Sequence, residues 1–204
     1  MYNTDLVKKE EAPKSIYDLT HPKWKGKVTI SDPRFGTMSF HAAALFTALG
    51  DDKAIEFFRS LKQNDVKVSP SNSDVRRLVE NGEVALGLTD TDDANTAIVS
   101  GKPVAMVYPD EQGIGTPFMP NLVSLIARGP NPENGKKLID FLVSPEAEEM
   151  LAKSEAVQIP LHRSVPLPAN VPKISDLKPL QVDYARVASR LEEVIKILQP
   201  ILGL

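Results

Sequence analysis

Residues 26–50 read GKVTISDPRFGTMSFHAAALFTALG, and this stretch decides the fold class. The run at residues 28–31 is short and rich in β-branched residues, and Gly26 and Pro33 bound it, which predicts a strand. From Ser39 onward, apolar residues recur at helical spacing and Gly50 follows them as a C-cap, which predicts a helix. A strand, a polar loop and a helix in succession are typical of an α/β fold.

The same alternation continues to about residue 108. A second helix follows Gly50 directly, and Asp51 is its expected N-cap. The pattern then predicts a strand at residues 66–68, a helix at residues 73–80 and a strand at residues 84–88 that is apolar on both faces, as in the middle of a parallel sheet. We therefore expect βαβ units in a mixed, mostly parallel sheet.

The second half of the chain gives a less regular pattern. Residues 104–108 and 122–127 predict two long strands, joined by a Gly/Pro-rich connection that can be a hairpin or a hinge. Helices are expected at residues 131–142 and after Ser144, which is a capping serine followed by Pro145. Residues 165–180 are proline-rich and irregular. Seven apolar residues at helical spacing from Tyr184 to Leu198 predict a tail helix that docks on the α/β unit.

Composition narrows the class of protein. The chain has 204 residues, of which 42% are hydrophobic and 25% charged, as in globular proteins. A net charge of -3 leaves no basic field for nucleic acid, so we expect no nucleic-acid partner. The first residues lack the basic and apolar regions of a signal peptide. The absence of cysteine excludes disulfides, thiolate metal sites and cysteine nucleophiles.

Three polar loops follow three predicted strands. The carboxyl ends of strands border the ligand crevice in open α/β sheets, and free N–H groups at helix starts bind anions. The sequence therefore predicts that the loops converge on a ligand, with these binding residues: Gly36, Thr37, Met38 and Ser39 in the first loop, Ser71, Asn72 and Ser73 in the second, and Thr89, Asp90 and Thr91 in the third. The alternative for each loop is a simple helix cap.

The third loop also concentrates negative charge. Asp90, Asp92 and Asp93 repel one another unless they are solvated, cap a helix or hold a cation. The spacing does not match a calcium-binding loop. Arg34 can neutralise an anionic ligand or pair with Asp32, whereas His41 is expected to be structural. The sequence contains no motif of a known enzyme class, so we do not expect an enzyme.

Several segments together resemble one family, the ferric-iron-type extracellular solute-binding proteins of ABC transporters. The resemblance runs from about residue 2 to residue 166 and rests on the order of five segments: 15–19 (SIYDL), 24–28 (WKGKV), 32–33 (DP), 81–87 (NGEVALG) and 139–148 (IDFLVSPEAE). It implies a periplasmic-binding-protein type II fold with two α/β lobes, between which a ligand is trapped by hinge closure.

The resemblance also implies a division of the chain. Residues 1–13 would be a crossing strand or linker, residues 14–91 the second lobe, residues 92–164 return hinge strands and helices that contribute to the first lobe, and residues 165–204 a C-terminal extension with a terminal helix. Much of the first lobe would be missing from this chain. Helices that should cover that lobe would then expose apolar surface, so we expect a homo-oligomer.

The ligand expected from the resemblance is iron(III) or another hard metal ion with a synergistic anion, or a small anionic solute. Iron-binding members carry paired tyrosines where this chain has Asp92 and Asp93, and carboxylates are also hard oxygen ligands. Residues 36–38 and Asn72 match positions that hold the synergistic anion in those members. No other cofactor is implied.

The resemblance implies a periplasmic or extracellular solute-binding protein whose partner is an ABC permease in the membrane. Two other classes share the architecture. A ligand-sensing regulatory domain would need a DNA-binding segment, and the sequence contains none. An enzyme like porphobilinogen deaminase would need a cysteine for its covalent cofactor, and the chain has no cysteine.

Overall fold

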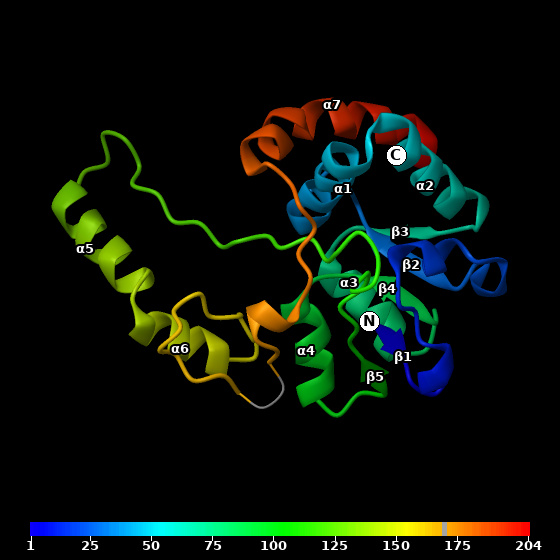
Figure 1. Cartoon of the computed structure of the whole chain (residues 1–204), viewed down its shortest axis with the longest axis horizontal. Helices are drawn as coiled ribbons and strands as arrows, with labels where there is room; N and C mark the ends of the chain where they lie inside the picture. Colours follow the sequence, from blue (N-terminus) through cyan, green and yellow to red (C-terminus); the bar gives the residue numbers. More distant parts are fainter. Residues whose placement is uncertain (169–170) are drawn as a thin grey trace.

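The computed structural model describes residues 1–168 and 171–204, which form a compact lobe and an arm that extends from it (Figure 1). The lobe is built on a five-stranded sheet of order β3-β2-β4-β1-β5. The strands are β1 (Tyr2–Asn3), β2 (Val28–Ser31), β3 (Lys67–Ser69), β4 (Leu86–Leu88) and β5 (Val104–Ala105).

The mixed α/β class expected from the sequence is confirmed. Strand β2 pairs in parallel with β3 and β4, whereas β1 pairs antiparallel with β4 and β5. The sheet is therefore mixed and mostly parallel, as expected, since β2, β3, β4 and β5 run in one direction and the N-terminal strand β1 enters between β4 and β5 in the opposite direction.

Helices cover both faces of the sheet (Figure 1). They are α1 (Gly36–Leu49), α2 (Asp51–Gln63) and α7 (Tyr184–Leu202) on one face, and α3 (Asn72–Glu80) and α4 (Thr91–Val99) on the other. Val187, Val194 and Leu198 of α7 belong to the same buried cluster as Phe46 of α1 and Phe58 of α2. The docking of the tail helix is thus confirmed.

Short 3-10 helices complete the lobe at residues Lys9–Glu11, Ile16–Thr20, Pro22–Trp24 and Ile174–Asp176. Trp24 is buried in the core. No helix in the described part of the chain is both long and apolar enough to cross a membrane.

Local capping signals are partly confirmed. Ser144 Oγ accepts a hydrogen bond from the Ala147 N–H at 3.2 Å, and α6 (Pro145–Lys153) begins at the next residue. Asp51, however, is not the N-cap of α2. It is the first helical residue, and Gly50 is both the C-cap of α1 and the N-cap of α2. The Asp51 carboxylate instead receives two hydrogen bonds from Arg190 of α7, at 2.8 and 3.0 Å.

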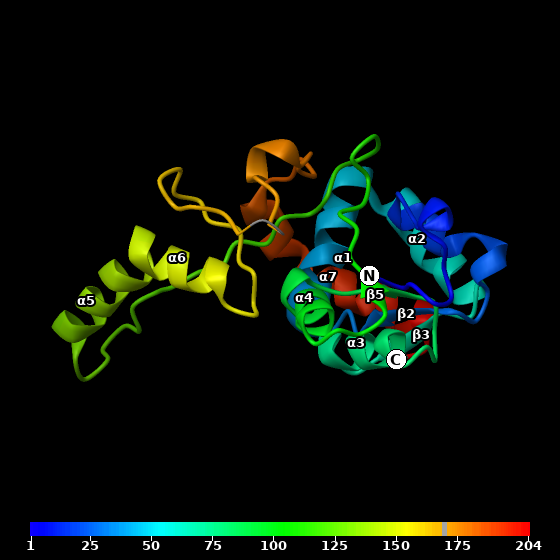
Figure 2. The same cartoon turned by 90° about the horizontal axis from the view of Figure 1, so that it is seen from below.

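The arm contains α5 (Pro132–Leu142) and α6 and stands away from the lobe in both views (Figures 1 and 2). Helix α5 has no buried residue. The strand expected at residues 122–127 is not formed, because a strand requires a hydrogen-bonded neighbour and the described residues supply none. The strand expected at residues 104–108 is likewise shortened to two residues.

The chain enters and leaves the arm at one crossing. The Thr116 N–H donates to the Lys178 carbonyl, and the Leu180 N–H donates to the Thr116 carbonyl, both at 2.8 Å. Gly115 is required beside them, because its φ is +93° and a Cβ would lie 2.6 Å from the backbone of Pro179. The connection at residues 109–120 therefore leads into the arm and is not a hairpin.

The crossing makes the arm an insertion between β5 and α7. The sheet contains β1 and β5, which lie outside residues 14–91, together with β2, β3 and β4, which lie within them. The domain bounds expected at residues 13, 91 and 164 stay predictions, since the two lobes to which they refer are implied by the resemblance alone.

Candidate functional site

Three helices of the lobe begin at the same edge of the sheet. Helices α1, α3 and α4 follow β2, β3 and β4, which are the three neighbouring parallel strands. Because the carboxyl ends of parallel strands meet at one edge, the starts of these helices are brought together there. The positive ends of three helix dipoles therefore face a common region.

One side chain from each predicted loop meets at this edge. Asn72 Nδ2 donates to Thr37 Oγ1 at 2.6 Å and also to Asp90 Oδ2, and Thr37 Oγ1 donates to the same carboxylate oxygen at 3.2 Å. Thr89 Oγ1 adds a bond to the Asn72 carbonyl at 3.4 Å. The predicted convergence of the three loops is present in the structure. The ligand-binding role of these residues stays a prediction.

Asp90 is the centre of this arrangement. Its carboxylate caps α4 by accepting the Asp93 N–H at 3.4 Å. Burial, together with the neighbouring Asp92 and Asp93 carboxylates, raises the pKa of Asp90 to about 7, although the bond from Thr37 opposes the rise. The carboxyl group is therefore poised between its neutral and charged forms near neutral pH.

Asp90, Asp92 and Asp93 form an acidic cluster. One carboxylate oxygen from each can lie within 4.8 Å of the others, and all three residues are half-buried. Oxygen atoms at such separations suit a hard cation or an ammonium group.

Arg76 is the residue of this region that sequence reasoning missed. Its Nη1 atom lies 3.4 Å from Asp93 Oδ1, and its Nε atom lies 3.9 Å from Glu80 Oε2. The guanidinium therefore balances part of the acidic charge and leaves Asp90 and Asp92 with the surplus. Asn72, Arg76 and Glu80 recur at intervals of four, so helical spacing could have indicated that they share one face of α3.

Other predicted binding residues have structural roles. Met38 is buried in the core, because α1 turns that side to the sheet, so its side chain cannot face a ligand. Ser71 caps α3 by accepting the Asp74 N–H at 3.1 Å, and Ser39 Oγ donates to the Gly36 carbonyl at 2.8 Å. Arg34 Nε and Nη2 donate to Asp32 Oδ2 at 3.0 and 2.6 Å. Of the two roles considered for Arg34, the structure therefore shows the pairing with Asp32.

Gly36, Ser73 and Thr91 remain at the starts of the three helices, where their backbone groups border the convergence point. The four tyrosines, all of which are described, lie in other elements: Tyr2 in β1, Tyr17 in a 3-10 helix, Tyr108 after β5 and Tyr184 in α7. None is in α4 or the loop before it. Among the described residues, this edge therefore offers carboxylate oxygens and no phenolate oxygen.

Comparison with known proteins places these features in context. Residues 1–187 match the model of a family described as bacterial extracellular solute-binding protein. The chain is 29% identical over 211 residues to iron uptake protein A1 of Synechocystis sp., an alignment that covers 97% of this chain and 57% of that protein.

Solved structures are similar over the whole chain. The periplasmic binding protein AfuA from Actinobacillus pleuropneumoniae, with exogenous fructose-6-phosphate bound, gives a TM-score of 0.85 at 26% identity and covers 100% of this chain and 65% of AfuA. Iron-bound HitA from Pseudomonas aeruginosa gives a TM-score of 0.80 at 21% identity, covering 100% and 65%. The type II periplasmic-binding fold is confirmed, and the chain spans less than two thirds of each of these three proteins.

Proposed function

Because the chain belongs to the family of bacterial extracellular solute-binding proteins, we propose that it is the solute-binding part of an ABC importer. In this role it captures a small solute outside the cytoplasmic membrane and delivers it to a permease. Of the similar proteins named above, one is an iron uptake protein, one is an iron-bound protein and one is a periplasmic binding protein, and none of them is a regulator or an enzyme by name. We therefore favour binding over catalysis and over ligand-sensing regulation.

The proposed ligand face is the convergence point of α1, α3 and α4. The observation that carries the proposal is the hydrogen-bonded triangle of Thr37, Asn72 and Asp90, which joins three helix starts. Backbone N–H groups at helix starts, aided by the helix dipoles, stabilise an anion. The amide of Asn72 and the hydroxyl of Thr37 are polar groups that can turn from Asp90 to a ligand.

The acidic cluster determines which net charge a bound ligand can carry. A bare anion would be repelled by Asp90 and Asp92, because Arg76 is paired with Asp93 and Glu80. A hard metal ion held between the carboxylates would remove that repulsion and bind an anion at the helix starts. We therefore propose a metal–anion pair as the ligand class, with iron(III) as the metal of first choice. A small anionic solute is the second candidate, because AfuA binds a sugar phosphate.

Calorimetric titration tests the proposal. The probes are inorganic phosphate alone, iron(III) supplied as its citrate complex, and phosphate together with a redox-inert divalent metal ion. We expect phosphate alone to bind weakly and the metal to strengthen its binding. Asn72→Ala should weaken anion binding about tenfold, the value of one hydrogen bond of ~1.4 kcal/mol.

Two further variants make the result specific. Asp92→Asn should abolish the effect of the metal while leaving the weak binding of phosphate unchanged or stronger. Ser100→Ala, at an exposed position beyond the far end of α4, serves as the matched control and should bind like the parent chain. Equal binding by the parent chain, Asn72→Ala and Asp92→Asn would contradict the proposed face but not the family.

A further inference from the structure

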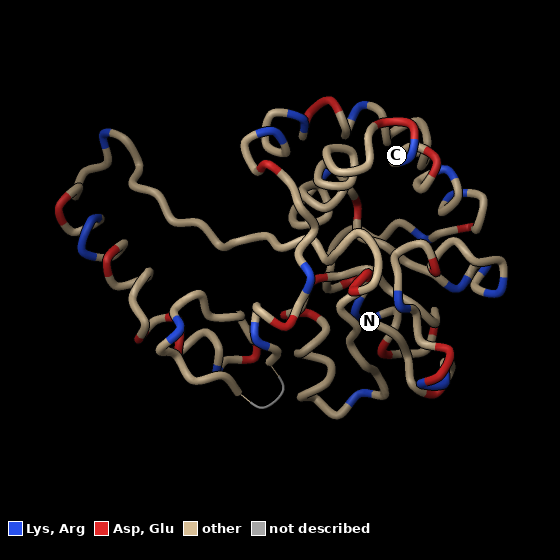
Figure 3. The backbone as a smooth tube through the Cα atoms, in the orientation of Figure 1, with Lys and Arg blue, Asp and Glu red and all other residues tan. Residues whose placement is uncertain are grey.

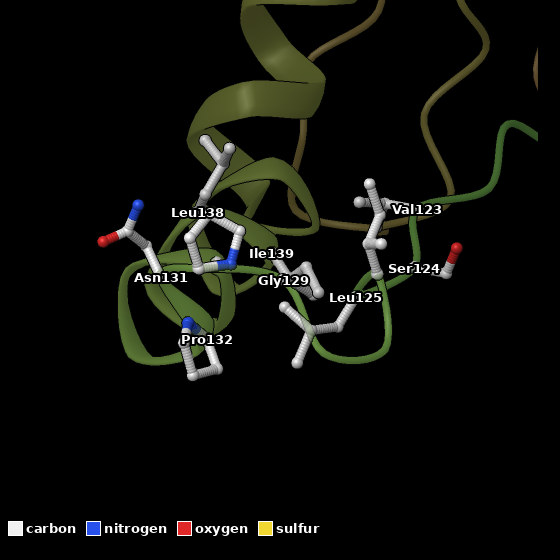
Figure 4. A pocket seen from close by; sticks show the side chains of 11 residues that line it. Val123, Ser124, Leu125, Gly129, Asn131, Pro132, Leu138 and Ile139 are labelled. Carbon is white, nitrogen blue, oxygen red and sulfur yellow. The ribbon is translucent and has the colours of Figure 1, made fainter.

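Charge separates the ligand face of the lobe from the hollow of the arm. Figure 4 shows this hollow of about 280 Å³ between residues 123–126 and α5. None of the described residues that line it is charged. Residues 112–127, which lead to it from the lobe, have no charged side chain and are drawn tan throughout (Figure 3). Charge can therefore control binding at the ligand face but not in this hollow.

The guanidinium of Arg76 lies between two carboxylates at the ligand face. Its Nη1 atom is 3.4 Å from Asp93 Oδ1 on α4, and its Nε atom is 3.9 Å from Glu80 Oε2 on α3 itself. The side chains of Arg76, Asp93 and Glu80 are only 27%, 13% and 16% exposed. Salt therefore screens their attraction less than it screens a pair in open solvent.

Arg76 is attracted to Asp93 without being locked to it. Charge-assisted N–H···O bonds are ~2.7–2.9 Å long, and both distances from Arg76 exceed that range. Its Nε atom is buried and has no hydrogen-bond partner among the described residues. An arginine that is fixed on a carboxylate makes two parallel bonds, as Arg190 does to Asp51 at 2.8 and 3.0 Å. The guanidinium of Arg76 can therefore exchange its partner more easily than that of Arg190.

Asp93 also belongs to the acidic cluster. One oxygen each from Asp90, Asp92 and Asp93 can come within 4.8 Å of the others, which suits a hard cation with three carboxylate ligands. Two positive groups thus have a claim on Asp93, namely the guanidinium of Arg76 and a cation in the cluster. A cation that takes Asp93 as its third ligand must break the pair with Arg76.

Helix α3 carries a second arginine that serves for comparison. Arg76 lies one turn after Asn72, whose amide donates to Asp90, so both side chains project from α3 towards the start of α4. Arg77 is the next residue in the chain, but its side chain is 57% exposed and pairs with Asp74 of its own helix at 2.8 Å. The two arginines therefore differ in their place relative to the acidic cluster.

We propose that Arg76 is a built-in competitor of the bound cation: it pairs with Asp93, and a cation entering the cluster displaces it to gain the third carboxylate. The proposal rests on the cation-binding role given above to the acidic cluster. The exchange lowers the affinity for the cation, because the pair is broken on binding and forms again on release. A protein that delivers its cargo to a permease needs such reversible capture.

Calorimetric titration with terbium(III) tests the competition. This hard, redox-inert ion is supplied as its chloride in buffer free of phosphate and citrate. Arg76→Gln and Arg76→Met remove the charge and should bind terbium(III) at least tenfold more tightly than the parent chain. Arg76→Lys keeps the charge and should stay within threefold of the parent chain. Arg77→Gln, the matched control, should also stay within threefold.

Asp93→Asn separates competition for a carboxylate from simple repulsion between charges. When residue 93 carries no charge, the cation has no pair to break. Arg76→Gln should therefore change the affinity less than threefold in the Asp93→Asn background. An equal gain from Arg76→Gln in both backgrounds would show that the guanidinium acts through its charge alone, and would overturn the proposal. Far-UV circular dichroism without metal ion checks that each variant keeps the helices of the parent chain.

Failure of this inference differs from failure of the proposed function. If the parent chain binds terbium(III), Asp92→Asn loses that binding, and both neutral variants of Arg76 bind no more tightly than the parent chain, only the role of Arg76 is rejected. If neither the parent chain nor the Arg76 variants bind terbium(III), the cation-binding role of the acidic cluster is rejected as well.

Discussion

The lobe and the arm both contain amphipathic helices, yet α2 of the lobe buries its large apolar side chains and α5 of the arm buries none. Phe57, Phe58 and Leu61 of α2 are at most 2% exposed, whereas Leu138 and Phe141 of α5 are 57% and 44% exposed. Helix α2 packs against α1 and α7, while α5 contacts α6 and lies beside residues 123–126. An apolar stripe thus predicts a helix and its inward face, but the covering partner comes from elsewhere in the chain or from another chain.

Matched phenylalanine substitutions should give the largest contrast between the two regions. Phe58→Ala leaves a cavity beside Phe46 and Phe57 and should cost about 3–5 kcal/mol of unfolding free energy. Phe141→Ala removes a side chain that is already half in solvent and should cost under ~1 kcal/mol in the monomer. Urea unfolding followed by circular dichroism measures both changes. Similar losses would mean that the arm is covered in solution.

Acid should lower the stability of the lobe because the ring of His41 is buried there. Its Nε2 atom is buried and has no hydrogen-bond partner among the described residues, and burial lowers the pKa of His41 to about 4. The unfolded chain takes up a proton near pH 6.5, so the stability due to neutral His41 is present above that pH and is lost as the pH falls towards 4.

The size of the acid effect can be isolated with His41→Gln, which does not titrate. Between pH 7 and pH 4 the parent chain should lose up to about 3 kcal/mol more than this variant. Unfolding curves at four pH values measure the difference. Parallel pH profiles for the two chains would show that His41 reaches solvent.

Two glycines should respond in opposite ways. A Cβ at Gly87, in β4, would lie 2.7 Å from Val75 and 2.8 Å from Val79, so Gly87→Ala should cost about 1–3 kcal/mol through overpacking. At Gly135 in α5, the near atom is the end of the partly exposed Leu125 side chain, which can move. Gly135→Ala should therefore be neutral or gain up to ~1 kcal/mol from helix propensity. A large loss at Gly135 would show that the arm is as rigid as the lobe.

These contrasts also explain how much the sequence could predict. The end of α1 and the start of α6 depend on nearby residues, namely the C-cap Gly50 and the N-cap Ser144, and both predictions are confirmed, whereas α1 begins at Gly36 and not at Ser39. The convergence of the three loops followed from the rule that parallel strands end at one edge. Here short-range signals and one topological rule were sufficient.

Features that depend on distant partners could not be predicted in the same way. The run at residues 122–127 has the composition of a strand, but no neighbouring strand lies beside it in the described structure. Arg76 gains its role only because α3 packs beside α4 and brings Asp93 within reach. Met38 belongs to a polar-looking loop by sequence, although the turn of α1 points it into the core.

The return of the chain from the arm to the lobe affects how the protein is made. The ribosome produces α1 and α2 before the arm, whereas α7, whose 19 residues cover them, emerges only after the arm. Until then the apolar faces of α1 and α2 are open to solvent, and closing so long a loop slows folding. Substitutions in α7 should therefore lower the yield of nascent protein through aggregation, even where they lie far from any ligand.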